Sequence, residues 1–158
     1  MQEIRIGDTD LHVSQFCLGC MPYGAKISGK DVDNLVDRFR DGGGNFFDTA
    51  HCYSFWQECG DGASERAIGE YIKKNGCRDS VIIATKGAHP AGGNYRKVEN
   101  YMSRGRIEAD IDDSLARLRT DVIDLYWLHR DDPRLDVGAI LDMLGAEVKR
   151  GRIRYFGG

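Results

Sequence analysis

The sequence lacks long apolar segments, because none of its hydrophobic runs approaches the roughly 20 residues that a membrane-spanning helix needs. Its opening residues, MQEIRIGDTD, contain no basic region followed by an apolar stretch, so no secretory signal is visible. An excess of one charge is also missing, since acidic and basic side chains are mixed along the chain and sum to −3. We therefore expect a cytoplasmic protein whose partners include neither a membrane nor a nucleic acid.

The sequence also lacks the usual glycine-rich loop for binding a dinucleotide. The fingerprint GxGxxG would follow the first predicted parallel strand, but GCMPYGAKISG, residues 19–29, stands there instead. The three glycines at residues 42–44 precede a strand, so they predict a tight turn. The five cysteines are odd in number and lie mostly in apolar contexts, which favours reduced thiols.

What the sequence does contain is the composition of one globular domain. Its 158 residues are 41% hydrophobic and 30% charged, and a chain of that length can bury one substantial core. Strand-like and helix-like patterns alternate along it after an expected β-hairpin within residues 3–14. We predict strands at residues 14–20, 45–50, 80–87, 121–132 and 153–158. We predict helices within residues 28–44, 62–76, 99–119 and 137–152, the second of them capped by Ser64.

Strand–helix alternation of this kind predicts right-handed βαβ crossovers and a parallel sheet with both faces covered. A doubly wound open sheet and a (β/α) barrel of the TIM type both fit the pattern. The barrel is favoured because polar side chains follow three successive strands. Asp48 ends the strand at 45–50, with Tyr53 in the loop after it, and Lys86 and His129 end the next two strands. In a barrel those strand ends open on one shared mouth.

These four residue types suit the reduction of a carbonyl group. A tyrosine hydroxyl is a weak acid, and a neighbouring ammonium such as Lys86 stabilises its phenolate. Asp48 can hold that ammonium by a charge-assisted hydrogen bond, and a neutral His129 can donate to the substrate oxygen. The hydride must come from a cofactor, since no side chain donates one.

Taken singly, each residue has an explanation without catalysis. Asp48 suits a loop cap or a buried ion pair, and Tyr53 suits packing or an exposed surface. Lys86 suits solvent, and His129 suits a buried site with its hydrogen bonds satisfied. The combination at the ends of consecutive strands favours a catalytic site.

The sequence resembles the aldo-keto reductase family, whose catalytic tetrad is Asp, Tyr, Lys and His. The tetrad segments are FFDTA (46–50), AHCYS (50–54), IATKG (83–87) and YWLHRDD (126–132). The flanking segments that also resemble the family are GASERAIGEYI (62–72), SLARLRTDVIDLYWLH (114–129) and VKRGRIRYFGG (148–158). The resemblance implies an NADPH- or NADH-dependent oxidoreductase that reduces an aldehyde, a ketone or a sugar-like substrate, or runs in reverse.

The resemblance also implies where cofactor and substrate lie. Cofactor contacts are expected from Cys20, Met21 and Asp48. Walls of the substrate pocket are expected from Tyr23, Phe55 and Trp56. The family barrel has eight strand–helix units, whereas residues 1–158 supply four units and the start of a fifth strand, so they are expected to form its N-terminal half. The unpaired sheet edges then predict either a missing C-terminal half-barrel or self-association as the partner.

Two other functions stay open at this point. One is a non-catalytic half-barrel that binds a nucleotide for regulation or serves as a structural module. The other is a metal-dependent hydrolase that uses Asp48, His51 and His129. The spacing of His51, Cys52 and Cys59 matches no standard zinc motif, and His89 would have to supply a distant fourth ligand. The sequence therefore predicts no metal site.

Overall fold

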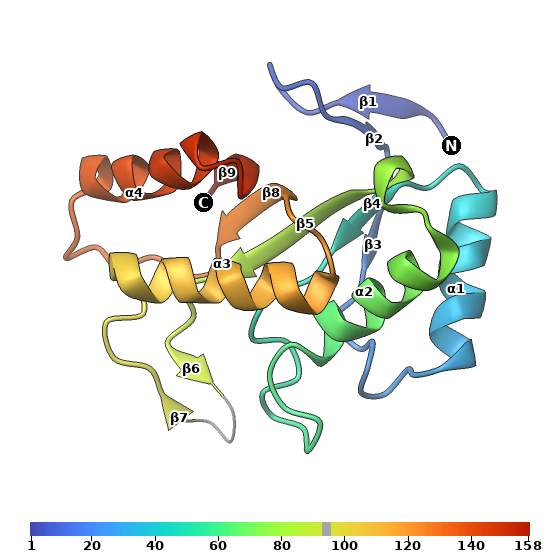
Figure 1. Ribbon diagram of the computed structural model, residues 1–158, viewed down its shortest axis with the longest axis horizontal. Helices are drawn as coiled ribbons and strands as arrows, with labels where there is room; N and C mark the ends of the chain where they lie inside the picture. Colours follow the sequence, from blue (N-terminus) through green and yellow to red (C-terminus); the bar gives the residue numbers. More distant parts are fainter. Residues whose placement is uncertain (93–95) are drawn as a thin grey trace.

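The centre of the molecule is a parallel sheet of five strands. The computed structural model describes residues 1–92 and 96–158. Within them the strand order is β3-β4-β5-β8-β9, so each strand pairs with its successor in this series (Figure 1). The strands span Cys17–Gly19, Phe46–Asp48, Ile82–Gly87, Ile123–Leu128 and Ile153–Gly157. Sequential order in a parallel sheet is the arrangement of a (β/α) barrel and differs from a doubly wound sheet, where the order reverses.

Four helices connect these strands and cover one face of the sheet. They are α1 (Lys30–Asp41), α2 (Ala63–Asn75), α3 (Arg104–Leu118) and α4 (Val137–Lys149), with a short 3₁₀ turn at Arg78–Ser80. Helices α2 and α3 pack side by side against each other (Figure 1). Every helix and parallel strand predicted from the sequence is present, although each is shorter than the predicted range at one end or both.

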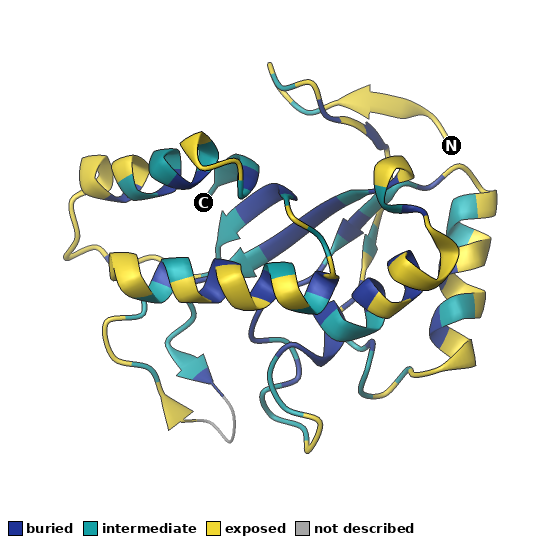
Figure 2. Cartoon of the chain, viewed as in Figure 1, coloured by how far each residue is buried: buried dark blue, intermediate teal, exposed yellow. Residues whose placement is uncertain are grey.

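The helix-covered face holds the main hydrophobic core. Alternate strand residues point to opposite faces of a sheet, and Phe47, Ile83 and Tyr126 point toward the helices. Each helix supplies a buried pair at helical spacing. These pairs are Val32 and Val36, Ile68 and Ile72, Ile107 and Ile111, and Ile140 and Leu144. Figure 2 shows the consequence, with buried strands behind helices whose outer sides are exposed.

The opposite face of the sheet is covered at one end by the N-terminal hairpin. Strands β1 (Glu3–Arg5) and β2 (His12–Ser14) pair antiparallel, as predicted, and lie apart from the helices in Figure 1. Leu11 and Val13 pack there on Ala84 and Leu125, with Trp127 partly buried against them. The hairpin therefore closes one end of the face that would be the inside of a barrel.

The start of α2 differs from the prediction that Ser64 caps it. The capping position is Gly62, at a φ of 72° that favours glycine, and no side chain bonds the helix end there. Ser64 lies inside the helix with a fully buried hydroxyl, which donates to the carbonyl oxygen of Cys20 and pairs with Thr49 Oγ1. The Ser64 hydroxyl therefore joins two strand ends to α2.

One small element was not predicted. Strands β6 (Ala91–Gly92) and β7 (Arg96–Lys97) pair antiparallel between β5 and α3, where the sequence analysis assigned no structure. None of the described helices combines the length and the apolar character needed to cross a membrane. The predicted fold is otherwise confirmed: the described chain is a parallel (β/α) assembly of four units and a fifth strand, preceded by a hairpin.

Candidate active site

Three of the four predicted catalytic residues meet at the nitrogen of one lysine. Lys86 Nζ donates to Asp48 Oδ2 at 2.7 Å and to the hydroxyl oxygen of Tyr53 at 3.0 Å. It also donates to the main-chain carbonyl oxygen of Thr49 at 2.7 Å. The ammonium lies 4.8 Å from the centroid of the Tyr53 ring. Lys86 thus has three oxygen acceptors, one of which is the phenol that the sequence analysis named as an acid.

The fourth predicted catalytic residue, His129, packs against the ring of Tyr53. Its ring meets the Tyr53 ring edge to face, with 5.7 Å between the centroids. Burial lowers the pKa of His129 to about 4, and the neighbouring His89 and Lys86 contribute to the shift. The imidazole is therefore neutral near pH 7 and can donate one hydrogen bond to a substrate oxygen. All four predicted catalytic residues lie together.

Strand register explains why residues so far apart in sequence converge. Asp48 pairs with Ala84 on β5, and Lys86, two residues further along β5, pairs with Trp127 on β8. Residues two apart on a strand share a face, so the side chains of Asp48, Ala84 and Lys86 all point to the face opposite the helices. His129 continues this edge, because its N–H donates to the carbonyl oxygen of Gly87 at 2.8 Å.

Main-chain hydrogen bonds also anchor the loop that carries Tyr53. The N–H of His51 donates to the carbonyl oxygen of Lys86 at 2.8 Å, which extends the β4–β5 pairing past the last strand residue. The N–H of Gly62 donates to the carbonyl oxygen of Tyr53 at 3.1 Å. These two hydrogen bonds fix the main chain on both sides of Tyr53. They thereby hold the Tyr53 hydroxyl next to the Lys86 ammonium.

The residues predicted to contact the cofactor differ in exposure. Met21 is 49% exposed directly after β3, so its side chain is available at the mouth. Cys20 is fully buried in the main core, where its thiol donates to the carbonyl oxygen of Leu18. The main chain of Cys20 donates to the carbonyl oxygen of Asp48 at 2.8 Å. A cofactor can therefore reach Met21 and Asp48, whereas the Cys20 side chain is enclosed.

The predicted pocket residues also divide into buried and accessible ones. Tyr23 is 2% exposed and belongs to the main core, and burial raises its pKa to about 12. Phe55 and Trp56 are half-buried, with their rings edge to face and centroids 4.9 Å apart. Phe55 also lies 5.5 Å from the ring of His89, which in turn lies 4.8 Å from His129. Aromatic rings thus run from the Tyr53 loop to His129, while Tyr23 lies in the core.

The metal-dependent alternative is not assembled in this structure. His51 is buried, and its Nε2 lies 3.0 Å from Asp113 Oδ2 and 3.7 Å from Asp110 Oδ1, both on α3. His51 therefore faces the helices, while Asp48 faces the mouth of the sheet. The proposed set of Asp48, His51 and His129 does not converge.

Sequence reasoning gave no role at this site to two neighbours of His129. Cys52 is buried, and its Sγ lies 3.5 Å from Nδ1 of His129. Burial raises the pKa of the Cys52 thiol to about 12, so the sulfur stays protonated near pH 7. His89 follows β5, and its ring meets that of His129 edge to face, with 4.8 Å between the centroids. The sequence suggested both residues only as members of a zinc set with His51 and Cys59, and that set was set aside because its spacing matches no standard motif.

Comparison with known proteins identifies the family. A sequence profile of the Aldo/keto reductase family matches residues 15–157. The aldo-keto reductase YhdN of Bacillus subtilis is 34% identical over 161 residues, covering 99% of this chain and 46% of YhdN. An aryl-alcohol dehydrogenase [NADP(+)] of Phanerodontia chrysosporium is 32% identical over 162 residues, covering 93% of this chain and 40% of that enzyme.

A solved structure gives the same result. The holo form of an aldo-keto reductase from Bacillus halodurans superposes with a TM-score of 0.82 at 31% identity, covering 99% of this chain and 49% of the other. The chain spans about half the length of the curated relatives that it matches. Its parallel sheet and strand order are those of the first units of such a barrel. On sequence and fold together, the chain belongs to the aldo-keto reductase family.

Proposed function

We propose that this chain supplies the acid–base half of an NADPH- or NADH-dependent carbonyl reductase. The observation that carries the proposal is the contact of Lys86 Nζ with both the Tyr53 hydroxyl and Asp48 Oδ2. An ammonium placed against a phenol stabilises the phenolate, and a carboxylate on the same ammonium keeps it charged and in position. The same contacts serve the reverse reaction, in which an alcohol is oxidised.

This geometry supports proton transfer from Tyr53. The Tyr53 hydroxyl donates its proton to the carbonyl oxygen of the substrate as that oxygen gains negative charge. Lys86 stabilises the phenolate left behind, and solvent returns a proton to it before the next cycle. A neutral His129 donates a hydrogen bond to the same substrate oxygen and fixes its direction. Positioned acid–base groups of this kind contribute about 10²–10⁴-fold to a rate.

The donor set of the site fits a nicotinamide cofactor. The site contains an acid, an ammonium and a neutral imidazole, and such side chains supply protons and hydrogen bonds but no hydride. A bound nicotinamide would supply the hydride to the carbonyl carbon. Of the three residues predicted to contact the cofactor, Met21 and Asp48 are accessible, and Phe55 and Trp56 would wall the substrate.

Nicotinamide absorbance provides the test. The purified full-length protein is mixed with NADPH or NADH and a panel of aldehydes and ketones, and oxidation of the cofactor is followed. Tyr53→Phe should lower turnover by about 10²–10⁴-fold while cofactor binding, measured by fluorescence, is retained. Tyr71→Phe is the matched control, because Tyr71 is a buried tyrosine of α2 on the helix-covered face and its variant should keep turnover.

The outcomes separate the competing functions. Turnover that survives Tyr53→Phe would show that another group is the acid. Cofactor binding with no turnover on any carbonyl would favour the regulatory alternative, and absence of both would favour a structural module.

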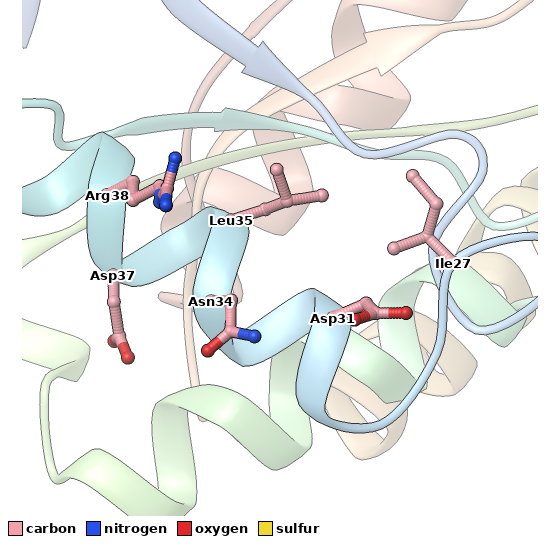
Figure 3. Close-up of a pocket in the computed structure, with 6 residues that line it drawn as sticks. All are labelled: Ile27, Asp31, Asn34, Leu35, Asp37 and Arg38. Carbon is pink, nitrogen blue, oxygen red and sulfur yellow. The ribbon is translucent and has the colours of Figure 1, made fainter.

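We also propose that a C-terminal half-barrel closes this sheet. Strands β3 and β9 are its edges, each paired on one side only among the described strands. Helix α1, next to the β3 edge, borders a hollow of about 640 Å³. In Figure 3 the side chains of Ile27 and Leu35 project toward this hollow, and Leu35 is 42% exposed. The lining residues are Ile27, Asp31, Asn34, Leu35, Asp37 and Arg38.

A helix of the second half-barrel would pack in this hollow beside α1, as neighbouring helices do around a barrel. Intact mass and solution mass together test the closure. A chain of about twice this length, or a complex with a second chain of similar size, would support it. A homodimer of 158-residue chains would show that a second copy covers the edges, and a stable monomer of that length would overturn the proposal.

A further inference from the structure

A second group of reactive side chains adjoins the tetrad. Cys52, His89 and His129 each offer one ligand atom, and these atoms lie within 4.8 Å of one another. They come from three places in the sequence: the loop after β4, the residues after β5 and the residue after β8. Cys52 is 3% exposed and the two histidines are half-buried, so the group is partly shielded from water.

The distance within this group suits a tetrahedral metal ion. Zinc binds sulfur at about 2.3 Å and imidazole nitrogen at about 2.0–2.1 Å, which separates adjacent ligand atoms by about 3.5 Å in a tetrahedron. Cys52 Sγ and His129 Nδ1 are 3.5 Å apart before any metal is added. One edge of the tetrahedron is therefore already set, and the ligand atom of His89 lies within 4.8 Å of the other two.

The backbone prepares His89 to act as a ligand. Nδ1 of His89 has two alternative partners on Ala91: it accepts from the N–H at 3.1 Å in one tautomer and donates to the carbonyl oxygen at 2.9 Å in the other. These contacts occupy Nδ1 and leave Nε2 for a cation. A metal selects the tautomer in which Nδ1–H donates to the Ala91 carbonyl, the support that metal-bound histidines ordinarily receive.

We propose that Cys52, His89 and His129 form a binding site for a soft divalent cation of the Zn²⁺ type, with a fourth position left to water. Sulfur and imidazole together select such a cation over Mg²⁺ or Ca²⁺, which prefer oxygen. As the sulfur–metal bond forms, the Cys52 thiol releases its proton to solvent. No electrons are exchanged, because Zn²⁺ has no redox chemistry.

Occupancy of this site inhibits the carbonyl reductase, a consequence that rests on the proposed function, whereas the binding does not. His129 would be a ligand and a substrate-orienting residue at once. Drawing three ligands into a tetrahedron shifts the His129 ring relative to Tyr53, and a misplacement of about 1 Å in such a group can cost about 10²-fold in rate. The metal-bound water also occupies space at the mouth.

Cobalt substitution tests the binding directly. Co²⁺ is titrated into the purified, metal-free protein under reduced conditions, and the thiolate-to-cobalt charge-transfer absorption and the visible bands of four-coordinate cobalt are recorded. We expect one equivalent to saturate both. Cys52→Ser should abolish the charge-transfer absorption, and His89→Gln should weaken affinity at least tenfold.

Matched variants guard against surface binding and misfolding. Cys59→Ser removes an exposed thiol from the same loop, and His12→Gln removes an exposed histidine on the hairpin; both should leave the titration unchanged. Circular dichroism confirms that Cys52→Ser is folded. Charge-transfer absorption that persists in folded Cys52→Ser, or His89→Gln that binds as tightly as the parent, would overturn the site.

Turnover provides the second reading. Zn²⁺ should inhibit the parent enzyme, and the half-inhibiting concentration should rise at least tenfold in His89→Gln, with each rate compared with the same protein in chelator. Equal inhibition of both proteins would overturn the link between the site and turnover. If the protein has no reductase activity, the cobalt titration still decides the binding.

Discussion

Two neighbouring residues of β5, Thr85 and Lys86, face opposite sides of the same sheet and have different environments. Thr85 is fully buried and donates to Glu65 Oε1 on α2 at 2.7 Å. Glu65 is also fully buried, and Arg117 of α3 lies 3.3 Å from its other oxygen. These three residues link a strand to two helices on the helix-covered face of the sheet, which we call the outer face. Because apolar side chains pack around them, this polar group is closed to solvent.

Lys86 points to the opposite, inner face of the sheet, at the strand ends where a barrel would open. The group of hydrogen-bonded residues around Lys86 is open to solvent there. The three acceptors of Lys86 hold the ammonium in place, but Tyr53 and His129 remain half-buried on the side where a substrate can enter. Similar hydrogen bonds therefore have different consequences on the two faces. On the outer face we expect them to contribute mainly to stability, and on the inner face mainly to chemistry.

Among the substitutions that test this difference between the two faces, the one at Lys86 should have the largest effect, and we expect that effect on turnover. Lys86→Met removes the ammonium while keeping a long side chain, so the phenolate of Tyr53 loses its stabilising charge. We expect turnover to fall by about 10²–10⁴-fold. Lys74→Met, which removes an exposed lysine paired with Asp33, should leave the rate unchanged. A similar loss in both variants would show that the effect comes from general charge.

Among the substitutions that affect stability, truncating a core side chain on the outer face should lower the free energy of unfolding the most. Ile83 is fully buried in the main core, and Ile83→Ala should lower the free energy of unfolding by about 2–5 kcal/mol. Ile82, the preceding residue, is only partly buried on the hairpin-covered face, so Ile82→Ala should cost less. Urea denaturation measures both, and equal losses would contradict the assignment of the main core to the helix side.

A smaller loss is expected from the polar link on the outer face. Thr85→Val keeps the shape of the side chain but removes the donor to Glu65, which leaves a buried carboxylate oxygen without that partner. The expected cost is about 1–3 kcal/mol. Thr85→Ser retains the hydroxyl and should lose less. If the Thr85→Val and Thr85→Ser variants are equally stable by urea denaturation, the hydrogen bond from Thr85 to Glu65 contributes nothing measurable.

A final effect, visible only below neutral pH, is the pH dependence of stability from His129. Its folded-state pKa is lowered from 6.5 to about 4, so between these values the unfolded chain binds the proton more readily. The corresponding stability is fully present above pH 6.5 and is lost as the pH falls toward 4. His129→Gln should unfold with a shallower pH dependence over this window. An unchanged slope would mean that other groups account for the dependence.

The sequence was informative about strands, helices and the tetrad for one reason. Buried strands and amphipathic helices leave local patterns, and the ends of parallel strands share one edge, so Asp48, Lys86 and His129 could be placed together before any coordinates. Ser64 was misassigned because the same hydroxyl suits a helix cap and a buried link, and only the packing of α2 against the strand ends distinguishes the two.

Sequence alone predicted the alternation of parallel strands and helices and the reactive groups at the strand ends, because these depend on periodicity and chain order. Tertiary structure decided the rest: His51 turns to Asp113, Tyr23 enters the core, and Cys52 meets His89 and His129. Such contacts depend on loop paths and distances between strands, which no local pattern specifies.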